Sequence, residues 1–332
     1  MISPPALSLV IAVFQRPRIL ELVLQSLEDQ TWSDFEVVLA DDGSDETVAE
    51  VARNWSARCP YPLRHVWQER RGFRKTIIVN RAVQESAGDH LVFIDADCIL
   101  HHRFLERHAV RRRPRQVLSG RRVMLDSELT GRLTPDDVRR RRIERPSFWW
   151  RHAKAHDRRN GIYAPALYGW RGGWSRSYAI LGSNFSLSRD SFARVNGYDE
   201  AILGRGMEDI NLGTRLLNAG CSIRSISQEA IQYHCHHDAE PMPHDAETIR
   251  RWRSTAETWT PRGLVKTELP ENVGAVYEIV IDGVDLASVE EATRAGVRAA
   301  CRPGIRRISA GNYGGKLGPF HLHLHKLLAP TA

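Results

Sequence analysis

The stretch "LVFIDADCIL", residues 91–100, is an apolar run that carries two carboxylates, Asp95 and Asp97, near its end. An unpaired carboxylate is costly to bury, so the run predicts a cation beside these side chains. Residues two apart on a continuing strand would face the same side of a sheet. Carboxylate oxygens are hard ligands that suit Mg²⁺ or Mn²⁺. An Asp-x-Asp spacing is common by chance, and its place at a strand end makes the predicted metal site more specific.

The chain before this stretch alternates apolar runs with segments of helical spacing. Strands are expected at residues 7–14, 35–45, 63–69 and 90–98. Helices are expected between them, at residues 18–30, 45–58 and 76–88. This alternation with short connections predicts a doubly wound α/β domain with a mostly parallel sheet. Ligands bind at the carboxyl ends of strands in such sheets, and a second acidic pair, Asp41-Asp42, also stands at a predicted strand end.

Composition narrows the class of protein. The 332 residues suit about two domains. The net charge of +7 favours anionic partners such as phosphorylated ligands or an acidic membrane surface, and the arginine bias of a GC-rich genome explains it equally well. Five scattered cysteines without C-x-x-C spacing favour a reducing compartment. No stretch approaches the ~20 apolar residues of a membrane span, so we expect a cytoplasmic protein, with peripheral contact at the inner face of the membrane allowed.

Two arginine-rich segments, residues 101–116 and 136–160, allow two interpretations. They form a solvated or acceptor-facing surface, or they bind an anion or a membrane. Further on, Trp170 and Trp174 lie in a Gly- and Ser-rich segment, where they either stack on a sugar or serve as packing residues.

Several of these stretches resemble a known family. The stretches "LSLVIAVFQRP", "FEVVLADDGSDET" and "LVFIDADCIL" are similar to family 2 glycosyltransferases of the GT-A fold. Residues 182–220, "GSNFSLSRDSFARVNGYDEAILGRGMEDINLGTRLLNAG", resemble the C-terminal half of galactosyltransferase and chondroitin-polymerase-type enzymes. The resemblance covers roughly residues 6–240. It implies a nucleotide-sugar-binding half at 1–115 and an acceptor-binding half at 116–255. The Pro- and charge-rich composition of residues 256–272 predicts a linker.

The resemblance also implies roles for residues on the donor side. Asp42, with Asp41 beside it, would contact the nucleoside, expected to be uridine, in a pocket that Phe14 and Arg74 help to line. Asp95 would contact the ribose or a metal-bound water, or itself be a ligand. Asp97 would hold Mn²⁺ or Mg²⁺ directly.

The third metal ligand is expected in the stretch "YHCHHD", residues 233–238, which offers His234, His236 and His237. His234 matches the family's ligand. His236 would share its face of a strand and would also be within reach. A solvated loop that binds no metal is the alternative interpretation of this cluster.

On the acceptor side, Asp209 in "GMED" matches the general base of inverting family members, and Glu208 would bind the acceptor. A sugar hydroxyl has a high pKa and must lose its proton as it attacks. The expected enzyme is a hexosyltransferase of polysaccharide biosynthesis. It would use a UDP-sugar donor and a saccharide or lipid-linked saccharide acceptor, with no nucleic acid partner. Alternatively, Asp209 is an ordinary surface carboxylate and Asp41 a helix cap.

The C-terminal tail, residues 273–332, has a pattern of its own that predicts a small β-α-β-β unit. The stretch "ISAGNYGGKLG" resembles the C-terminus of formylmethanofuran:tetrahydromethanopterin formyltransferase. Most of that enzyme has no counterpart here, so the tail is a fusion, a vestige or an assembly module. Two other readings of the whole chain stay open. One is a non-catalytic nucleotide-sugar-binding scaffold, and the other is a cofactor-modifying transferase linked to tetrahydromethanopterin C1 metabolism.

Overall fold

A computed structural model of the chain describes residues 4–166, 180–238 and 245–267. The chain divides into two compact units, Met1–Leu269 and Pro270–Ala332. The predicted β-α-β-β tail lies outside the described residues, as do Trp170 and Trp174. The boundaries expected at residues 115, 255 and 272 stay predictions.

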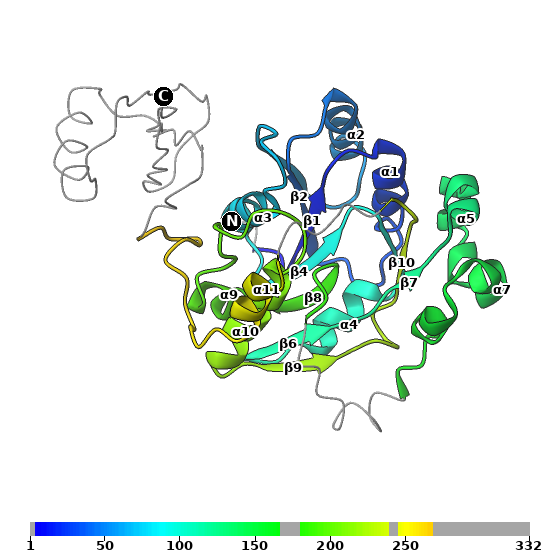
Figure 1. Ribbon diagram of the computed structural model, residues 1–332. Coiled ribbons are helices and arrows are strands. Elements are labelled where there is room, and N and C mark those ends of the chain that lie inside the picture. Colours follow the sequence, from blue (N-terminus) through cyan, green and yellow to red (C-terminus); the bar gives the residue numbers. More distant parts are fainter. Residues whose placement is uncertain (1–3, 167–179, 239–244, 268–332) are drawn as a thin grey trace, which may run out of the picture. The chain divides into compact units, whose positions relative to one another are not determined.

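The central feature of the described residues is a seven-stranded sheet in the order β3-β2-β1-β4-β8-β6-β9 (Figure 1). Its strands are β1 (Leu7–Val13), β2 (Phe35–Asp41), β3 (Leu63–Trp67), β4 (His90–Asp95), β6 (Gln116–Ser119), β8 (Asn184–Ser188) and β9 (Ser222–Ser225). The first four run parallel, and β8 lies antiparallel between β4 and β6. This is the mostly parallel α/β sheet that the sequence predicts.

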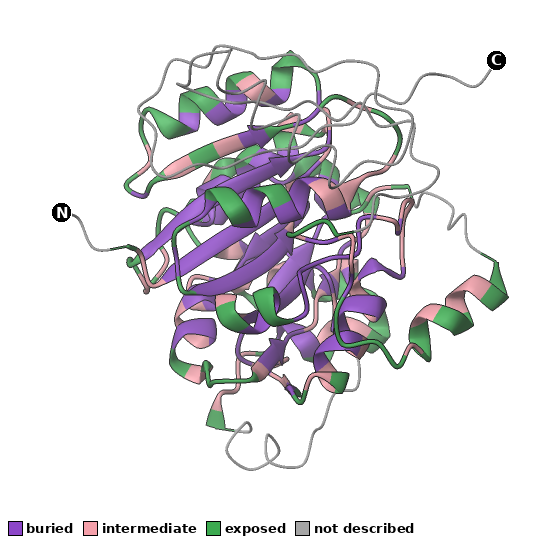
Figure 2. Ribbon diagram, turned by 90° about the vertical axis from the view of Figure 1, so that its left-hand side faces the viewer, coloured by how far each residue is buried: buried purple, intermediate pink, exposed green. Residues whose placement is uncertain are grey.

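Helices cover both faces of the sheet, which explains why β1 is apolar on both sides. Leu9 and Ile11 pack in one apolar cluster and Val10 packs in the other. On the Leu9 side lie α1 (Pro17–Gln25), α2 (Glu46–Ser56) and α4 (Phe104–Arg111). On the Val10 side lie α3 (Lys75–Glu85), α9 (Arg189–Arg194) and α10 (Glu208–Asn218). The inner strands β1, β2, β4 and β8 are buried, while the edge strands β3 and β9 and the outer faces of these helices are partly exposed (Figure 2).

A second, smaller sheet contains His234, one of the candidate metal ligands. It contains β5 (Cys98–Leu100), β10 (Gln232–His234) and β7 (Val123–Met124), with β10 in the middle. Strand β4 ends at Asp95, residues 96–97 form a turn, and β5 begins at Cys98. The strand therefore does not continue through Asp97, so alternation does not place Asp95 and Asp97 on one face.

Short helices form most of the arginine-rich region after β7. They are α5 (Ser127–Arg132), α6 (Pro135–Arg139), η1 (Arg142–Glu144), α7 (Pro146–Trp149), η2 (Trp150–His152) and η3 (Ala155–Gly161). They lie at one margin of the molecule in Figure 1, beyond α1 and β7. None of the described helices is long and apolar enough to cross a membrane.

The last described segment follows α11 (Ala246–Arg253), a helix that packs against α10. Residues 260–267, which we call the strap, fold back on themselves through an antiparallel bridge between Arg262 and Lys266. Thr260 is fully buried there. Residues 256–267 thus pack against the α/β domain along the part of the predicted linker that the structure describes.

Candidate functional site

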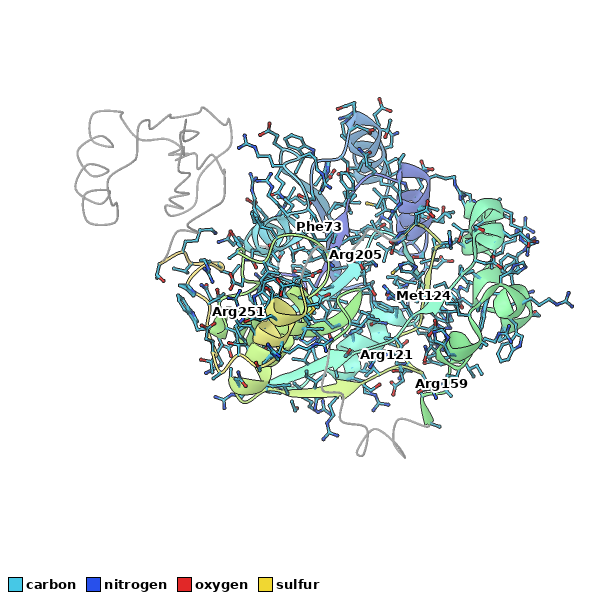
Figure 3. All side chains as sticks on the ribbon, viewed as in Figure 1. Phe73, Arg121, Met124, Arg159, Arg205 and Arg251 are labelled. Carbon is cyan, nitrogen blue, oxygen red and sulfur yellow. The ribbon has the colours of Figure 1, made fainter. Side chains whose placement is uncertain are left out.

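A cleft of about 320 Å³ opens at the carboxyl ends of β1 and β4, between the two halves of the sheet. Phe73 and Arg205, which are labelled in Figure 3, lie together over this edge of the sheet, and Gly204 N donates to Phe73 O at 3.1 Å. The sequence-predicted residues that line the cleft are Phe14, Asp42, Asp95, Asp97, Glu208, Asp209 and His234. Asp41 and Arg74 do not line it.

Asp42 forms one wall of the cleft and is held by three donors. Gln68 Nε2 donates to its Oδ1 at 2.6 Å, and Arg70 Nη1 and Arg74 N donate to its Oδ2 at 2.8 and 2.7 Å. Burial raises the pKa of Asp42, and these hydrogen bonds oppose that rise. The Arg70 guanidinium also stacks on the Phe14 ring, 3.8 Å from its centroid. A planar base could lie against this wall.

Asp41 and Arg74 lie behind the cleft wall, where they contact neighbouring residues of the loops. Asp41 is fully buried, where its carboxylate accepts from Ser44 N at 2.8 Å and contacts His65 Nε2 at 2.8 Å. It closes the turn after β2. Arg74 contacts Asp42 through its backbone N–H, while its guanidinium donates to Glu69 O. The structure therefore places Asp42 at the cleft and Asp41 behind it.

Asp95 faces a lysine rather than the histidines. Lys75 Nζ, at the start of α3, lies 2.9 Å from Asp95 Oδ1 and 3.8 Å from Glu208 Oε1. Burial alone would lower the pKa of Lys75, but the charges of Asp95, Asp209 and Glu208 raise it well above its usual value. Lys75 is thus a permanent cation between the predicted donor and acceptor sides.

Asp97 faces two histidines across the turn after β4. Its Oδ1 lies 3.4 Å from His234 Nε2 and its Oδ2 lies 3.1 Å from His237 Nε2. One ligand atom from each of these residues lies within 4.8 Å of the others. His236, by contrast, is exposed, and its backbone N–H binds Thr130 Oγ1 at 2.8 Å. Asp95 is not part of this group.

The hydrogen bonds of His237 indicate that a cation belongs in this cluster. Its Nδ1 lies 2.8 Å from Asp238 O, a carbonyl that can only accept, so Nδ1 carries the ring proton. A neutral His237 would then point a lone pair from Nε2 at the Asp97 carboxylate, which is repulsive unless a proton or a metal ion lies between them. A carbonyl behind the imidazole is also the usual support of a metal-bound histidine. The three residues therefore fit a divalent metal.

A second cluster of similar composition does not fit a metal. His101 and His102 contact Glu144 at 3.5 and 2.6 Å. The other ring nitrogens accept hydrogen bonds, His101 Nδ1 from Arg103 N and His102 Nε2 from Arg103 Nε. The nitrogens that face Glu144 therefore carry protons and donate to it.

Glu208 and Asp209 begin α10 on the far side of the cleft. Tyr198 OH donates to Asp209 Oδ1 at 2.8 Å. A Cβ added at Gly182 would lie 1.8 Å from Asp209 Oδ2, so only glycine allows this approach. Burial raises the pKa of Asp209. Burial, and then the charge of Asp209, raise the pKa of Glu208 to about 7.

The backbone just before this pair is strained. Met207, the residue that precedes α10, has φ = 108°, a left-handed value that side chains other than glycine rarely adopt. Such strain persists where the surrounding structure holds it, and it clusters at functional sites. Glu208 Oε2 is also buried without a hydrogen-bond partner among the described residues. The turn therefore stores energy next to two carboxylates that line the cleft, the buried Glu208 and the half-buried Asp209.

Lys75 and Tyr198 are residues of this site that the sequence does not predict. Lys75 has one signal, since the chain has few lysines among many arginines. His237 is one of the three histidines that the sequence offers, but strand alternation favours His236 as the partner of His234, whereas β10 ends at His234. Tyr198 had no local signal at all.

Comparison with known proteins agrees with this geometry. Residues 8–163 match the model of glycosyl transferase family 2. The chain carries a family 2 glycosyltransferase domain. Residues 172–238 match the N-terminal domain of galactosyltransferase. The sequence-predicted resemblance is therefore confirmed, and the GT-A fold with it.

Of the solved structures compared, the one with a TM-score above 0.5 supports the fold alone, because its sequence identity to this chain is low. A crystal structure of S. aureus TarS 1-349 in complex with UDP is 17% identical, with a TM-score of 0.51, over 74% of this chain and 64% of that one. The mannosyltransferase PcManGT from Pyrobaculum calidifontis, in complex with GDP-Man and Mn²⁺, is 18% identical, with a TM-score of 0.48, over 70% of this chain and 57% of that one.

The C-terminal part matches a different family. Residues 252–327 match the family described as FTR, proximal lobe. Formylmethanofuran–tetrahydromethanopterin formyltransferase of Methanothermus fervidus is 60% identical over 62 residues, which are 18% of this chain and 21% of that protein. The Methylococcus capsulatus protein is 51% identical over 82 residues, 23% of this chain and 28% of that protein. The chain thus spans about a fifth to a quarter of these curated relatives.

Proposed function

We propose that this protein is an inverting glycosyltransferase that moves a sugar from a nucleotide-diphosphate donor, a UDP-sugar, to an acceptor hydroxyl. One observation carries the proposal. A single cleft places Asp42 on one wall, the Asp97–His234–His237 cluster at its floor, and Asp209 on the opposite wall. These are the three contacts that a nucleoside, a diphosphate and an acceptor require in that order.

The donor would be held from both ends. Asp42 would accept from the uracil ring, with Phe14 beside it, while Asp95 would contact the ribose or a metal-bound water. Asp97, His234 and His237 would hold Mn²⁺ or Mg²⁺, and two imidazoles favour Mn²⁺. When bound, the metal would neutralise charge on the departing diphosphate.

The acceptor side supplies the base. Asp209 would take the proton of the acceptor hydroxyl as its oxygen bonds to the anomeric carbon and the bond from that carbon to the diphosphate oxygen breaks. Attack from the face opposite the leaving group inverts the anomeric centre. Glu208 would bind the acceptor next to the base. Lys75, 2.9 Å from Asp95 and 3.8 Å from Glu208, offsets part of the negative charge of this acidic site.

The acceptor is proposed to be a saccharide or a lipid-linked saccharide reached at the membrane surface. The short helices after β7 expose basic side chains and an indole. Trp150 is 41% exposed. Its exposed basic neighbours are Arg139, Arg140, Arg141, Arg145, Arg151, Lys154 and Arg159. Basic residues near an anionic surface and amphipathic aromatic rings favour peripheral contact with a membrane.

The tail is proposed to serve in assembly rather than catalysis. Its formyltransferase-like match covers 21% of the relative from Methanothermus fervidus, too little of that enzyme to propose formyl transfer. A small unit of this kind would gain stability by packing on another subunit.

The direct test is nucleotide release from a panel of UDP- and GDP-sugars with Mn²⁺, using the wild-type protein and Asp97→Ala. The wild type should release UDP from at least one donor, and Asp97→Ala should not. Equal release by the two proteins, or no release from any donor with or without saccharide acceptors, would contradict the proposal.

A further inference from the structure

The strap, residues 260–267, is fastened to the domain through one buried asparagine. Asn196 Nδ2 donates to Thr260 O and to Val265 O, each at 2.6 Å, and its Oδ1 accepts from Val265 N at 2.7 Å. Its backbone carbonyl also accepts from Leu264 N at 2.9 Å. One side chain thus satisfies the backbone of both arms of the strap.

The strap packs tightly against the domain at Gly263. A Cβ added at Gly263 would lie 1.7 Å from Asn196 O, so a glycine is required there. Two ion pairs flank the contact, Lys266 Nζ with Glu200 Oε1 at 3.1 Å and Arg262 with Asp199 at 3.3 Å. The strap is therefore built onto residues 196–200, which we call the bridging turn.

The bridging turn is gripped from the domain side as well. Asn80, on α3, accepts from Tyr198 N and donates to Tyr198 O, each at 2.9 Å, so both backbone polar groups of Tyr198 are held. Arg215, on α10, is fully buried and donates to Val195 O and Gly197 O at 2.6 and 2.8 Å. The strap closes the remaining side of the same turn.

Tyr198 links the bridging turn to Asp209, which lines the cleft. Its ring is 1% exposed and packs edge-on against Phe93 and Phe192. Its hydroxyl donates to Asp209 Oδ1 at 2.8 Å. Phenylalanine would fill the same apolar space, so the contact that the hydroxyl adds is the one to Asp209.

We propose that Tyr198 is a positioning residue for Asp209, and that the strap holds Tyr198 in place through the bridging turn. Donation to Oδ1 fixes the carboxylate plane and leaves Oδ2 to accept from a substrate. The strap, which lies within the formyltransferase-like match of residues 252–327, is by this inference part of the glycosyltransferase scaffold. The inference rests on the proposed function of Asp209.

The test compares Tyr198→Phe, Gly263→Ala and their combination in the full-length protein. The probes are UDP binding with Mn²⁺ by calorimetry, and kcat and KM with the donor and acceptor found in the panel. Tyr198→Phe should lower kcat about 10- to 100-fold, as misplacement of a catalytic group does, with KM and UDP affinity unchanged within about two-fold. The double variant should be no slower than Tyr198→Phe, because both changes act through one contact.

Matched controls separate positioning from general loss of stability. Tyr61→Phe also removes a buried tyrosine hydroxyl, bonded to Leu24 O at 3.2 Å, and Val265→Ala trims a strap side chain that is 61% exposed. Both should keep wild-type kcat. If Gly263→Ala does not fold, Lys266→Met takes its place, because it removes the pair with Glu200 and the hydrogen bond that Lys266 Nζ donates to Gly263 O at 3.1 Å within the strap. A wild-type kcat for Tyr198→Phe, or losses that multiply in the double variant, would overturn the proposal.

A second measurement keeps this inference separate from the proposed function. If the wild type releases no nucleotide from any donor, the proposed function fails. The contact is then tested by urea unfolding of Tyr198→Phe, Asp209→Ala and the double variant. Shifts in unfolding midpoint that fall short of additivity support the Tyr198–Asp209 contact, and additive shifts overturn it.

Discussion

At the scale of single residues, the site depends on which nitrogen of a histidine holds the proton. The Asp238 carbonyl accepts a hydrogen bond from His237 Nδ1–H, which leaves the lone pair on Nε2, the nitrogen that faces Asp97. His234 Nδ1 is buried without a hydrogen-bond partner among the described residues, while its Nε2 faces Asp97. Both imidazoles therefore offer Nε2 to the same point in space.

We expect His237→Ala to weaken Mn²⁺ binding at least about 10-fold, since loss of even a supporting partner costs 10- to 100-fold. Titration followed by the Mn²⁺ electron paramagnetic resonance signal measures this without any turnover. His236→Ala is the matched control, because its exposed side chain is not in the cluster. Equal affinity of the two variants would remove His237 from the metal site.

Asp209→Asn should keep UDP binding and lose sugar transfer about 10²- to 10⁴-fold, because removing a positioned base costs that much. The product of the wild type should have the inverted anomeric configuration. NMR of the anomeric proton reads the configuration directly. Retention of configuration would rule out this role of Asp209.

At the scale of elements, the start of α10 is brought against the loop before β8. Gly182 precedes β8, and its missing Cβ leaves the space in which the Asp209 carboxylate lies. Glycine is thus required at position 182 because of Asp209, which lies 27 residues further along the chain on α10. The loop before β8 and the start of α10 meet at this carboxylate.

Gly182→Ala should therefore abolish sugar transfer while the protein stays folded, because the methyl group would displace Asp209. Gly131→Ala, in α5, is the control, since a Cβ there meets nothing within 4 Å. The control should keep activity and gain up to about 1 kcal/mol from helix propensity. Circular dichroism and UDP release measure the two effects, and an active Gly182→Ala would show that the contact is dispensable.

Another link between elements is a pair of buried histidines. His90 on β4 and His108 on α4 share Ser186 Oγ on β8, at 3.0 and 2.8 Å. Burial lowers the pKa of each histidine to about 3. An unfolded histidine titrates near 6.5, so only the unfolded state gains these protons between about pH 6.5 and 3. Stability should be unaffected by them above that window and fall as the pH drops through it.

The expected slope is up to about 1.4 kcal/mol per pH unit for each histidine. His108→Gln should reduce the difference in unfolding free energy between pH 7 and pH 5, measured in urea. His156→Gln, at a histidine whose side chain is 76% exposed, should leave that difference as it is. An unchanged difference in His108→Gln would contradict this account.

At the scale of the whole molecule, the end of the glycosyltransferase unit lies after the strap. The first compact unit runs to Leu269, well beyond the family matches that end at residue 238. Asn196 and Glu200 hold the strap through five contacts shorter than 3.2 Å among those given above. The strap therefore belongs with the domain by contact, whatever its sequence resembles.

Truncation at two points should separate strap from tail. A chain that ends at Leu269 keeps the strap and should fold and bind UDP with Mn²⁺ like the full chain. A chain that ends at Ser254 lacks it and should have a lower melting temperature and a lower kcat. Thermal unfolding and UDP release compare the two. Equal melting temperatures and equal kcat values for the two truncated chains would show that the strap contributes neither to stability nor to activity.

Much of this protein was predictable from local pattern. Apolar runs located the parallel strands, because a strand covered on both faces must be apolar along its length. The carboxylates that follow those runs, Asp42 and Asp97, then had to lie at the ligand-binding edge of the sheet. The "GMED" motif singles out Glu208 and Asp209, and both lie at the start of α10. These inferences need only period and order along the chain.

Other parts of the site were decided by contacts between distant segments. Because β4 stops at Asp95, the turn sends Asp95 to Lys75 and Asp97 to two histidines, which alternation along a strand could not foresee. Tyr198 reaches Asp209 only because α3, α10 and the strap converge on the bridging turn. Strand and helix periods state which face a residue takes within its own element. Which other element meets that face is set by packing of the whole chain, and that is a tertiary property.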